Sequence, residues 1–209
     1  NIKDLQYEEY GNIEKISTPK GLKWVEKSPV RIHKESFMPH YRDVGSGVLI
    51  GHKRSWSSVG EEYEKLIKHQ FKNPISVREK AFELVGNKID PEAKIDTLIN
   101  WVRQNIRYQE AGFGGHSLIP QLSNTTLLQR NGDCKDQSLL LYELLNTISI
   151  PSKLTLINLE HPVTSALPSI QQFNHMILYI PKGIGYEERY VDLTEDVGTD
   201  RVIPFNLEG

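Results

Sequence analysis

The sequence predicts an α+β fold, because strand-like and helical stretches occupy separate parts of the 209-residue chain. Residues 1–57 contain short alternating apolar runs broken by prolines and glycines, which is typical of β-rich structure. From residue 58 the apolar residues recur with a helical period, and after residue 152 the alternation returns. We therefore expect a β-rich segment over residues 1–57, the end of a preceding β domain, and a mixed helix and sheet domain over residues 58–209.

Short strands are expected in the first part, with aromatic side chains filling its core. The alternating stretches are Leu22–Val25, Val30–His33 and Gly45–Ile50. Trp24, Phe37 and Trp56 are scattered among them. Because aromatic residues in a small β unit usually pack inside it, we favour this role over an exposed binding surface.

Three helices follow, and the third has the strongest signals. Val59–Gln70 and Ser76–Val85 each place apolar residues on one face. The third helix begins with Asp90 as N-cap and Pro91 at the first helical position. Its apolar stripe consists of Ala93, Ile95, Leu98, Ile99, Val102 and Ile106. This helix is expected to carry the helical core, with Trp101 packing at the border of the stripe.

Cys134 is the single cysteine of the chain and stands where a Gly-Asp turn runs into a leucine-rich helix. The first N–H groups of a helix lack intrahelical partners, and the helix dipole is positive at that end. A thiolate is favoured there, which makes Cys134 a candidate nucleophile. Asp136 and the expected N-cap Asp133 oppose a thiolate, while Lys135 partly offsets their charge. On position alone, a small apolar residue packed under a helix explains Cys134 equally well.

Residues 108–132, which precede Cys134, have no period and are rich in glycine, proline and asparagine. The glycines do not match a phosphate-binding fingerprint, because no strand leads in and no Gly-Lys-Ser/Thr follows. We expect a loop that forms a rim or lid beside the nucleophile. His116 lies in this loop, and we favour a solvent-exposed side chain over a role in chemistry.

The chain returns to strands after Pro151, which ends the cysteine helix. The expected strands are Lys153–Leu159, Phe173–Ile180 and Glu188–Leu193. A short turn between the last two predicts a hairpin, which brings His175 towards Asp192. Together with Cys134, these residues form a candidate Cys-His-Asp triad, although a half-buried strand histidine and a turn-capping aspartate are the ordinary alternatives.

Each member of this triad would have a defined chemical role. His175 takes the proton of Cys134 and later protonates the leaving amine, while Asp192 fixes the imidazole tautomer. Cys134 attacks a carbonyl carbon and holds the acyl group as a thioester. The N–H of Cys134 supplies one oxyanion donor, and Gln121 and Gln129 are open candidates for the second.

Composition excludes several classes of function. The 25 basic and 27 acidic residues nearly balance and no long basic run occurs, so we expect no nucleic-acid partner. No apolar run approaches the roughly 20 residues that span a bilayer. A lone cysteine excludes an internal disulfide, and the seven histidines are dispersed, so no metal or cofactor is predicted. The start at Asn1 suggests a mature or truncated fragment whose export signal could have been removed.

Four segments of the chain resemble the transglutaminase-like superfamily of papain-like cysteine enzymes. They are Asn131–Asp136 before the leucine-rich helix, Ile148–Pro151, Phe173–Met176 and Tyr190–Thr194. The Gly-Asp-Cys-Lys-Asp form is similar to a bacterial branch in which this domain follows a β-rich domain of unknown function. Residues 37–56 resemble the end of that preceding domain. The likeness is strong over residues 90–197, looser over residues 35–90 and slight before them.

The resemblance implies a papain-like α+β core, with a nucleophile helix packed on an antiparallel sheet and Cys134, His175 and Asp192 as the triad. It favours the nucleophile interpretation of Cys134. The implied activity is acyl transfer or hydrolysis of amide or peptide bonds in a peptide or protein substrate, and we favour hydrolysis. Members also include proteins thought to be inactive, so an inactive binding or assembly module is the alternative. Exported bacterial relatives suggest an extracytoplasmic location, and the calcium dependence of animal transglutaminases is not carried over.

Overall fold

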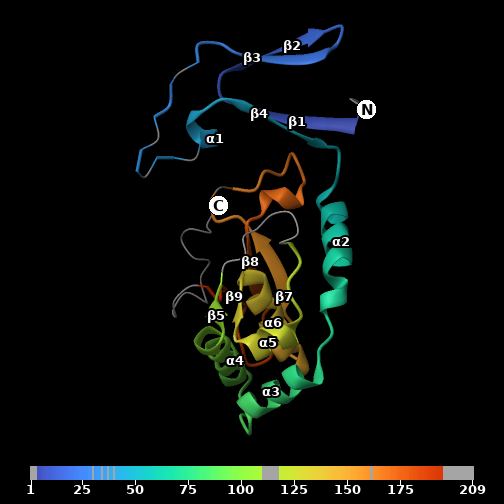
Figure 1. Cartoon of the computed structure of the whole chain (residues 1–209), viewed down its shortest axis with the longest axis vertical. Coiled ribbons are helices and arrows are strands. Elements are labelled where there is room, and N and C mark those ends of the chain that lie inside the picture. Colours follow the sequence, from blue (N-terminus) through green and yellow to red (C-terminus); the bar gives the residue numbers. More distant parts are fainter. Residues whose placement is uncertain are drawn as a thin grey trace. The chain divides into compact units, whose positions relative to one another are not determined.

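The computed structural model describes residues 4–29, 31–33, 35–36, 38–39, 41–109, 118–160 and 162–194. The chain divides into two compact units. Unit 1 consists of Asn1–Glu62 and Glu160–Gln172, and unit 2 consists of Tyr63–Leu159 and Phe173–Gly209. The helices and strands of both units are labelled in Figure 1.

Unit 1 contains two antiparallel strand pairs. β1 (Leu5–Tyr10) pairs with β4 (Gly47–His52), and β2 (Ile13–Thr18) pairs with β3 (Gly21–Glu26) (Figure 1). The short helix α1 (Tyr41–Val44) precedes β4. The β-rich character expected of the first part of the chain is therefore present in its described residues.

Aromatic packing joins the two strand pairs of unit 1. The Trp24 ring meets the Tyr7 ring edge to face with centroids 5.2 Å apart, and Trp24 Nε1 donates to Glu9 Oε1 at 2.7 Å. Trp24 thus packs within the unit, Trp56 is half-buried, and Phe37 lies outside the described residues. The strand expected over residues 30–33 is wrong where it is described, because residues 31–33 pair with no strand.

A segment from the second half of the chain completes unit 1. Gln6 Nε2 donates to the Ala166 carbonyl at 2.7 Å, and Thr164 Oγ1 donates to Glu8 Oε2 at 2.6 Å. Leu167 is buried. Residues 160–172 therefore belong to the β-rich unit, although the strands before and after them in the sequence belong to unit 2.

Unit 2 packs helices against a three-stranded antiparallel sheet, which is an α+β architecture. Its main helices are α3 (Ile75–Val85), α4 (Pro91–Asn105), α5 (Ser123–Gln129) and α6 (Cys134–Thr147). The sheet has the order β7 (Lys153–Ile157), β8 (His175–Ile180), β9 (Arg189–Val191) (Figure 1). In the described part of the chain, no helix is both long and apolar enough to cross a membrane.

Several local predictions for unit 2 are confirmed. The Asp90 side chain caps α4 by accepting from the Ala93 N–H, and Pro91 stands at the first helical position. β8 and β9 pair as the expected antiparallel strands, with Leu178 opposite Val191. These features depend on neighbouring residues, which explains why the sequence indicates them.

Part of the expected loop before Cys134 is helical instead. α5 forms within it because Thr126 and Leu127 find buried positions, and α5 ends at Arg130, which adopts a left-handed φ of 57°. β5 (Arg107–Tyr108) and β6 (Asn131–Gly132) pair in parallel on either side of this stretch. A seven-residue helix with three buried residues, two of them polar, gives too short a pattern to be recognised from periodicity.

α6 is the central helix of unit 2 and is buried along most of its length. It contacts β8 and the three helices α3, α4 and α5. Its leucines join one apolar cluster with side chains of α3, α4, β8 and β9. The members that α6 contributes are Leu140, Leu141, Leu144 and Leu145. A helix surrounded on all sides in this way is fixed in position by packing.

Glu143 of α6 is a buried carboxylate that binds two other segments. Its Oε1 accepts from the N–H groups of Lys72 at 2.9 Å and Asn73 at 2.8 Å, which lie just before α3. Its Oε2 accepts from the Ser123 hydroxyl at the start of α5. Glu143 therefore joins α6 to α5 and to the segment before α3 at a single side chain that is 1% exposed.

We expect Glu143→Ala to lower the free energy of unfolding of the protein by about 2 to 4 kcal/mol, because three hydrogen-bond donors would lose their acceptor. Urea denaturation followed by circular dichroism measures the change. Glu79→Ala, an exposed position on α3, is the control and should change stability by no more than about 0.5 kcal/mol. Equal effects of the two substitutions would contradict the role given to Glu143.

Candidate active site

The N-terminus of α6 is built by a reciprocal capping arrangement around Cys134. Asp133 Oδ1 accepts from the N–H groups of Lys135 at 2.9 Å and Asp136 at 3.2 Å. Asp136 Oδ2 in return accepts from the Asp133 N–H at 3.0 Å. This capping box makes Cys134 the first residue of the helix, where its side chain lies at the positive end of the helix dipole.

Gly132 permits this tight turn into α6. A Cβ atom at Gly132 would lie 2.6 Å from the Asp136 Cβ and 3.2 Å from both Asp136 Oδ2 and Thr126 Cγ2. The first distance is well inside van der Waals contact, so a side chain here would displace the capping residue. The glycine before Asp133 is therefore required by close approach.

The charged residues that flank Cys134 are buried and paired. Lys135 Nζ lies 2.5 Å from Asp133 Oδ2, and these side chains are 2% and 5% exposed. Gln121 donates to Asp136 twice, from its N–H at 2.8 Å and from Nε2 at 3.2 Å. Burial raises the pKa of the Asp136 carboxyl, against the hydrogen bond from the Gln121 N–H, which lowers it. The negative charge around Cys134 is therefore smaller than two free carboxylates would produce.

His175 and Asp192 meet across the sheet edge of unit 2. His175 begins β8, and Asp192 follows the last residue of β9. His175 Nε2 lies 2.8 Å from Asp192 Oδ2, and both side chains are buried. The Asp192 Oδ1 accepts from the N–H of Thr194 at 2.9 Å and from its hydroxyl at 2.7 Å. Asp192 is therefore both a turn-capping residue and the partner of His175.

Cys134 reaches the same imidazole from α6. Burial alone would lower the pKa of His175, but hydrogen bonds to Asp192 and Cys134 and the charges of both raise it to about 9. Because Nε2 is held by Asp192, Nδ1 is the ring nitrogen available to the Cys134 sulfur. The structure thus brings together Cys134, His175 and Asp192, which lie far apart in the sequence.

The carboxylate of this group is stabilised in its charged form. Burial would raise the pKa of Asp192, but the hydrogen bond and charge of His175 and the two hydrogen bonds from Thr194 hold it below its usual range. The arrangement therefore favours an imidazolium beside a carboxylate. A neutral imidazole held in this way can receive a proton from a thiol, becoming the imidazolium, and return that proton to a leaving group.

Two side chains beside this group were not indicated by the sequence. The Arg103 guanidinium donates through Nη2 to the Asp192 carbonyl at 2.6 Å. Tyr63 is buried and lies within the electrostatic range of Cys134. Burial raises the pKa of its phenol, and the charges of Cys134 and Asp133 raise it further. Its hydroxyl donates to the Leu118 carbonyl at 2.9 Å. Among the contacts of the Asp192 carboxylate, only the one with Thr194 was indicated locally in the sequence. The two-residue spacing is typical of a turn capped by an aspartate.

The candidate oxyanion donors differ in what they contact. The Gln121 amide donates to the Asn131 carbonyl at 3.3 Å and to Asp136 Oδ2, so it holds the turn before Cys134. Gln129 is exposed, and its carbonyl accepts from the Asn131 side chain. The Asp133 side chain caps the N–H groups of the two residues after Cys134 and leaves the Cys134 N–H itself uncapped. His116 lies outside the described residues.

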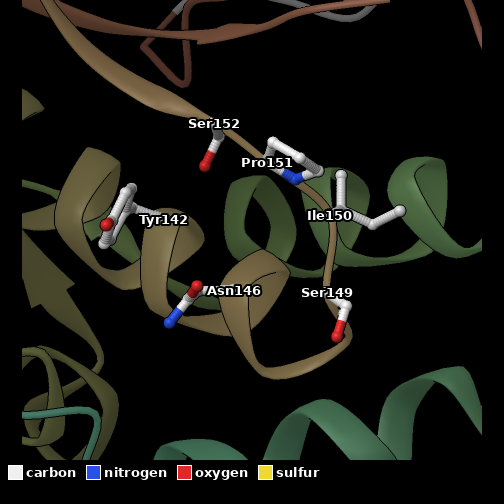
Figure 2. A pocket seen from close by; sticks show the side chains of 6 residues that line it. All are labelled: Tyr142, Asn146, Ser149, Ile150, Pro151 and Ser152. Atoms are coloured by element: carbon white, nitrogen blue, oxygen red, sulfur yellow. The ribbon is translucent and has the colours of Figure 1, made fainter. Parts of the chain in front are cut away.

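A separate pocket lies at the other end of α6 (Figure 2). It has a volume of about 420 Å³ and is lined by Tyr142, Asn146, Ser149, Ile150, Pro151 and Ser152. None of the triad candidates lines it, so it is distinct from the Cys134 site. Among the residues that the structure describes, no group of three His, Cys, Asp or Glu side chains is arranged to hold a metal ion.

The fold and these side chains define a class of protein: a papain-like core with a cysteine at the start of its central helix and a histidine and an aspartate on the adjoining sheet. The sequence model of the Transglutaminase-like superfamily matches residues 78–191, which is more than half of the 209 residues, and the chain belongs to this superfamily.

Two solved structures resemble the chain. A proposed protease from Parabacteroides distasonis ATCC 8503 has a TM-score of 0.68 and 15% sequence identity, over 90% of this chain and 37% of that one. A proposed cysteine protease from Cytophaga hutchinsonii has a TM-score of 0.46 and 12% identity, over 92% of this chain and 65% of that one. The first likeness shows the fold alone, and the chain spans less than two thirds of either protein. No curated protein has a matching sequence.

We expect Gly132→Ala to lower the free energy of unfolding by about 1 to 3 kcal/mol, because the added Cβ would displace Asp136 from the capping box. Chemical denaturation measures the loss. Gly60→Ala is the matched control, since its Cβ would meet no heavy atom within 4 Å in the α2 helix (Trp56–Ile67). That substitution should be neutral or stabilise by up to about 1 kcal/mol, and a neutral Gly132→Ala would contradict the close-approach argument.

We expect protonated His175 to stabilise the folded protein in a pH-dependent way. Its pKa in the folded state is about 9 against an ordinary 6.5, so the folded state binds this proton more tightly. The contribution, up to about 3 kcal/mol, is fully present below about pH 6.5 and is lost as pH rises through about 9. Urea denaturation of the wild type and His175→Gln across this range measures it. A difference between the two proteins that does not shrink with rising pH would contradict the assignment.

Proposed function

We propose that the protein is a cysteine-dependent enzyme that cleaves amide or peptide bonds through a thioester intermediate. The observation that carries the proposal is the 2.8 Å contact of His175 Nε2 with Asp192 Oδ2, with the Cys134 side chain at the same imidazole. We assign Cys134 as nucleophile, His175 as general base and acid, and Asp192 as the group that orients and stabilises the imidazolium.

The proposed reaction uses these groups in sequence. The Cys134 proton passes to His175 Nδ1, and the thiolate sulfur attacks the substrate carbonyl carbon to form a tetrahedral adduct. The carbon–nitrogen bond then breaks, and His175 delivers its proton to the leaving amine, which leaves an acyl thioester on Cys134. Water then attacks the thioester carbonyl carbon while His175 accepts one of its protons. The carbon–sulfur bond breaks, the carboxylic acid product departs, and the Cys134 thiolate recovers its proton from His175.

The Cys134 N–H is the proposed oxyanion donor. It points from the first turn of α6, and the Asp133 side chain takes the N–H groups of the two following residues instead. A donor that is left uncapped at a helix start and lies on the nucleophile's own residue is suited to the developing negative charge of a tetrahedral adduct.

Hydrolysis is the outcome that we favour over transfer to an amine. A carboxylate would attract a cationic amine acceptor, but the three acids described at the site have partners. Asp133 pairs with Lys135, Asp136 with Gln121, and Asp192 with His175. Water needs no such group. A peptide or protein substrate fits both this chemistry and the family.

The second candidate function is a catalytically inactive binding or assembly module. Burial favours it, because Cys134 is 5% exposed and His175 is 4% exposed. A substrate carbonyl has to reach the sulfur, so an enzyme of this design must open further than the structure shows.

The proposal predicts that iodoacetamide modifies Cys134 at about pH 6 at least tenfold faster than it modifies glutathione, because His175 is placed to take up the proton of the thiol. Intact-protein mass spectrometry measures the rate. His175→Ala should lower it by about tenfold or more, while His69→Ala, an exposed histidine, should leave it unchanged.

A panel of peptide amides tests turnover, with liquid chromatography and mass spectrometry to detect both product and an acyl adduct on Cys134. Cys134→Ala should abolish both, and His175→Ala should reduce turnover by about 10² to 10⁴. Slow alkylation together with no adduct from any amide would reject the enzyme and leave the binding module. In that case Cys134→Ala would fold normally and keep the protein's biological role.

A further inference from the structure

The carboxylate of Asp192 is held at a position that the sheet does not fix. The β8–β9 ladder has three residue pairs, and Leu178 opposite Val191 is the last before the site. If this register continued, His175 would face Thr194, and Asp192 would be its diagonal neighbour. Diagonal neighbours on paired strands lie farther apart than direct ones, so their contact depends on how the main chain is placed.

Arg103 of α4 supplies that placement. Its Nη2 donates to the main-chain carbonyl of Asp192 at 2.6 Å, one residue beyond the end of β9. The bond reaches the backbone of Asp192 and leaves both carboxylate oxygens to other partners: Oδ1 to Thr194 and Oδ2 to His175. The main chain and the side chain of Asp192 are thus held separately.

A second contact anchors the other end of β9 to the same helix. Arg189 Nη1 donates to Asp96 Oδ1 at 2.7 Å, and Arg189 also forms an ion pair with Glu92. Residues four and seven apart share a helix face, so Glu92, Asp96 and Arg103 lie along one side of α4. We name these three residues and Arg189 the α4 clamp. It holds a three-residue edge strand at both ends, where few ladder hydrogen bonds are available.

We propose that Arg103 is a positioning residue of the candidate active site, which acts by fixing the Asp192 main chain so that Oδ2 meets His175 Nε2. The consequence for activity rests on the function proposed above, whereas the positioning itself does not. Arg103 touches none of the reacting atoms, so its effect passes through Asp192 to His175. A displacement of about 1 Å at such a site can lower a rate by about a hundredfold.

If Arg103 had only a structural role, its removal would have a different effect. Its loss would lower stability without changing the proton affinity of His175 in the molecules that remain folded. A positioning role requires that the affinity fall, because the His175–Asp192 hydrogen bond is a main cause of the raised pKa. Lysine at the same position keeps the charge but lacks the planar donor fork, so it should restore the contact only in part.

The test is NMR titration of the histidine ring resonances in isotope-labelled, full-length protein, with the His175 signal assigned by its loss in His175→Gln. The wild type should titrate near 9. Arg103→Met should lower the pKa of His175 by about one, which is a tenfold loss of proton affinity, and Arg103→Lys should lower it by less. Arg78→Met, an exposed arginine on α3, is the matched control and should leave it unchanged. Iodoacetamide modification of Cys134 at about pH 6 should slow about tenfold in folded Arg103→Met.

An unchanged His175 titration in folded Arg103→Met would overturn the proposal. If that variant does not fold, Arg103→Lys decides, since a wild-type titration there with the guanidinium absent would also overturn it. The two proposals can fail independently. A wild type that cleaves no amide, but whose His175 titrates near 9 and shifts in the Arg103 variants, would reject the enzyme and support the positioning role.

Discussion

A helix buried along most of its length must satisfy its terminal backbone groups inside the protein, and much of unit 2 depends on how α6 does so. Asp133 binds the N–H groups of Lys135 and Asp136, and Asp136 binds that of Asp133. Lys135 compensates the charge of Asp133, and Gln121 brings the preceding loop onto Asp136. These contacts leave little freedom for Cys134. The position of the sulfur is therefore a consequence of helix capping and core packing together.

The charged side chains on the sheet side of the candidate site are paired in the same way. The candidate site contains carboxylates that are each partnered, and its histidine is held by Asp192 at one ring nitrogen, which leaves the other to Cys134. Burial strengthens each of these contacts, because little water competes for them. It also limits access to the sulfur, so chemistry at Cys134 requires motion around the site. Burial therefore both strengthens the polar contacts of the candidate site and limits access to Cys134.

Membership of the Transglutaminase-like superfamily accounts for the core of unit 2, where the matched residues 78–191 include Cys134, His175 and most of the helical packing. Asp192 follows directly after the matched range, and its placement rests on contacts made by this chain: the carbonyl to Arg103 and Oδ1 to Thr194. The β-rich unit is likewise held together by contacts of this chain, because residues 160–172 join it by hydrogen bonds to β1. The fold alone fixes neither substrate nor acyl acceptor, since both depend on the groups around the sulfur.

The sequence by itself determined the features that depend on near neighbours. The start of α6 at Cys134, the Asp90 cap and the β8–β9 pairing follow from capping residues, apolar period and a short turn. The predicted hairpin also brought Asp192, which directly follows β9, towards His175 at the start of β8. Only the tertiary structure decided the contact of Arg103 with Asp192, which spans 89 positions of the chain, and the use of Gln121 as a loop anchor. Such contacts form between side chains that tertiary packing brings within hydrogen-bond distance, and no local sequence pattern predicts which side chains these are.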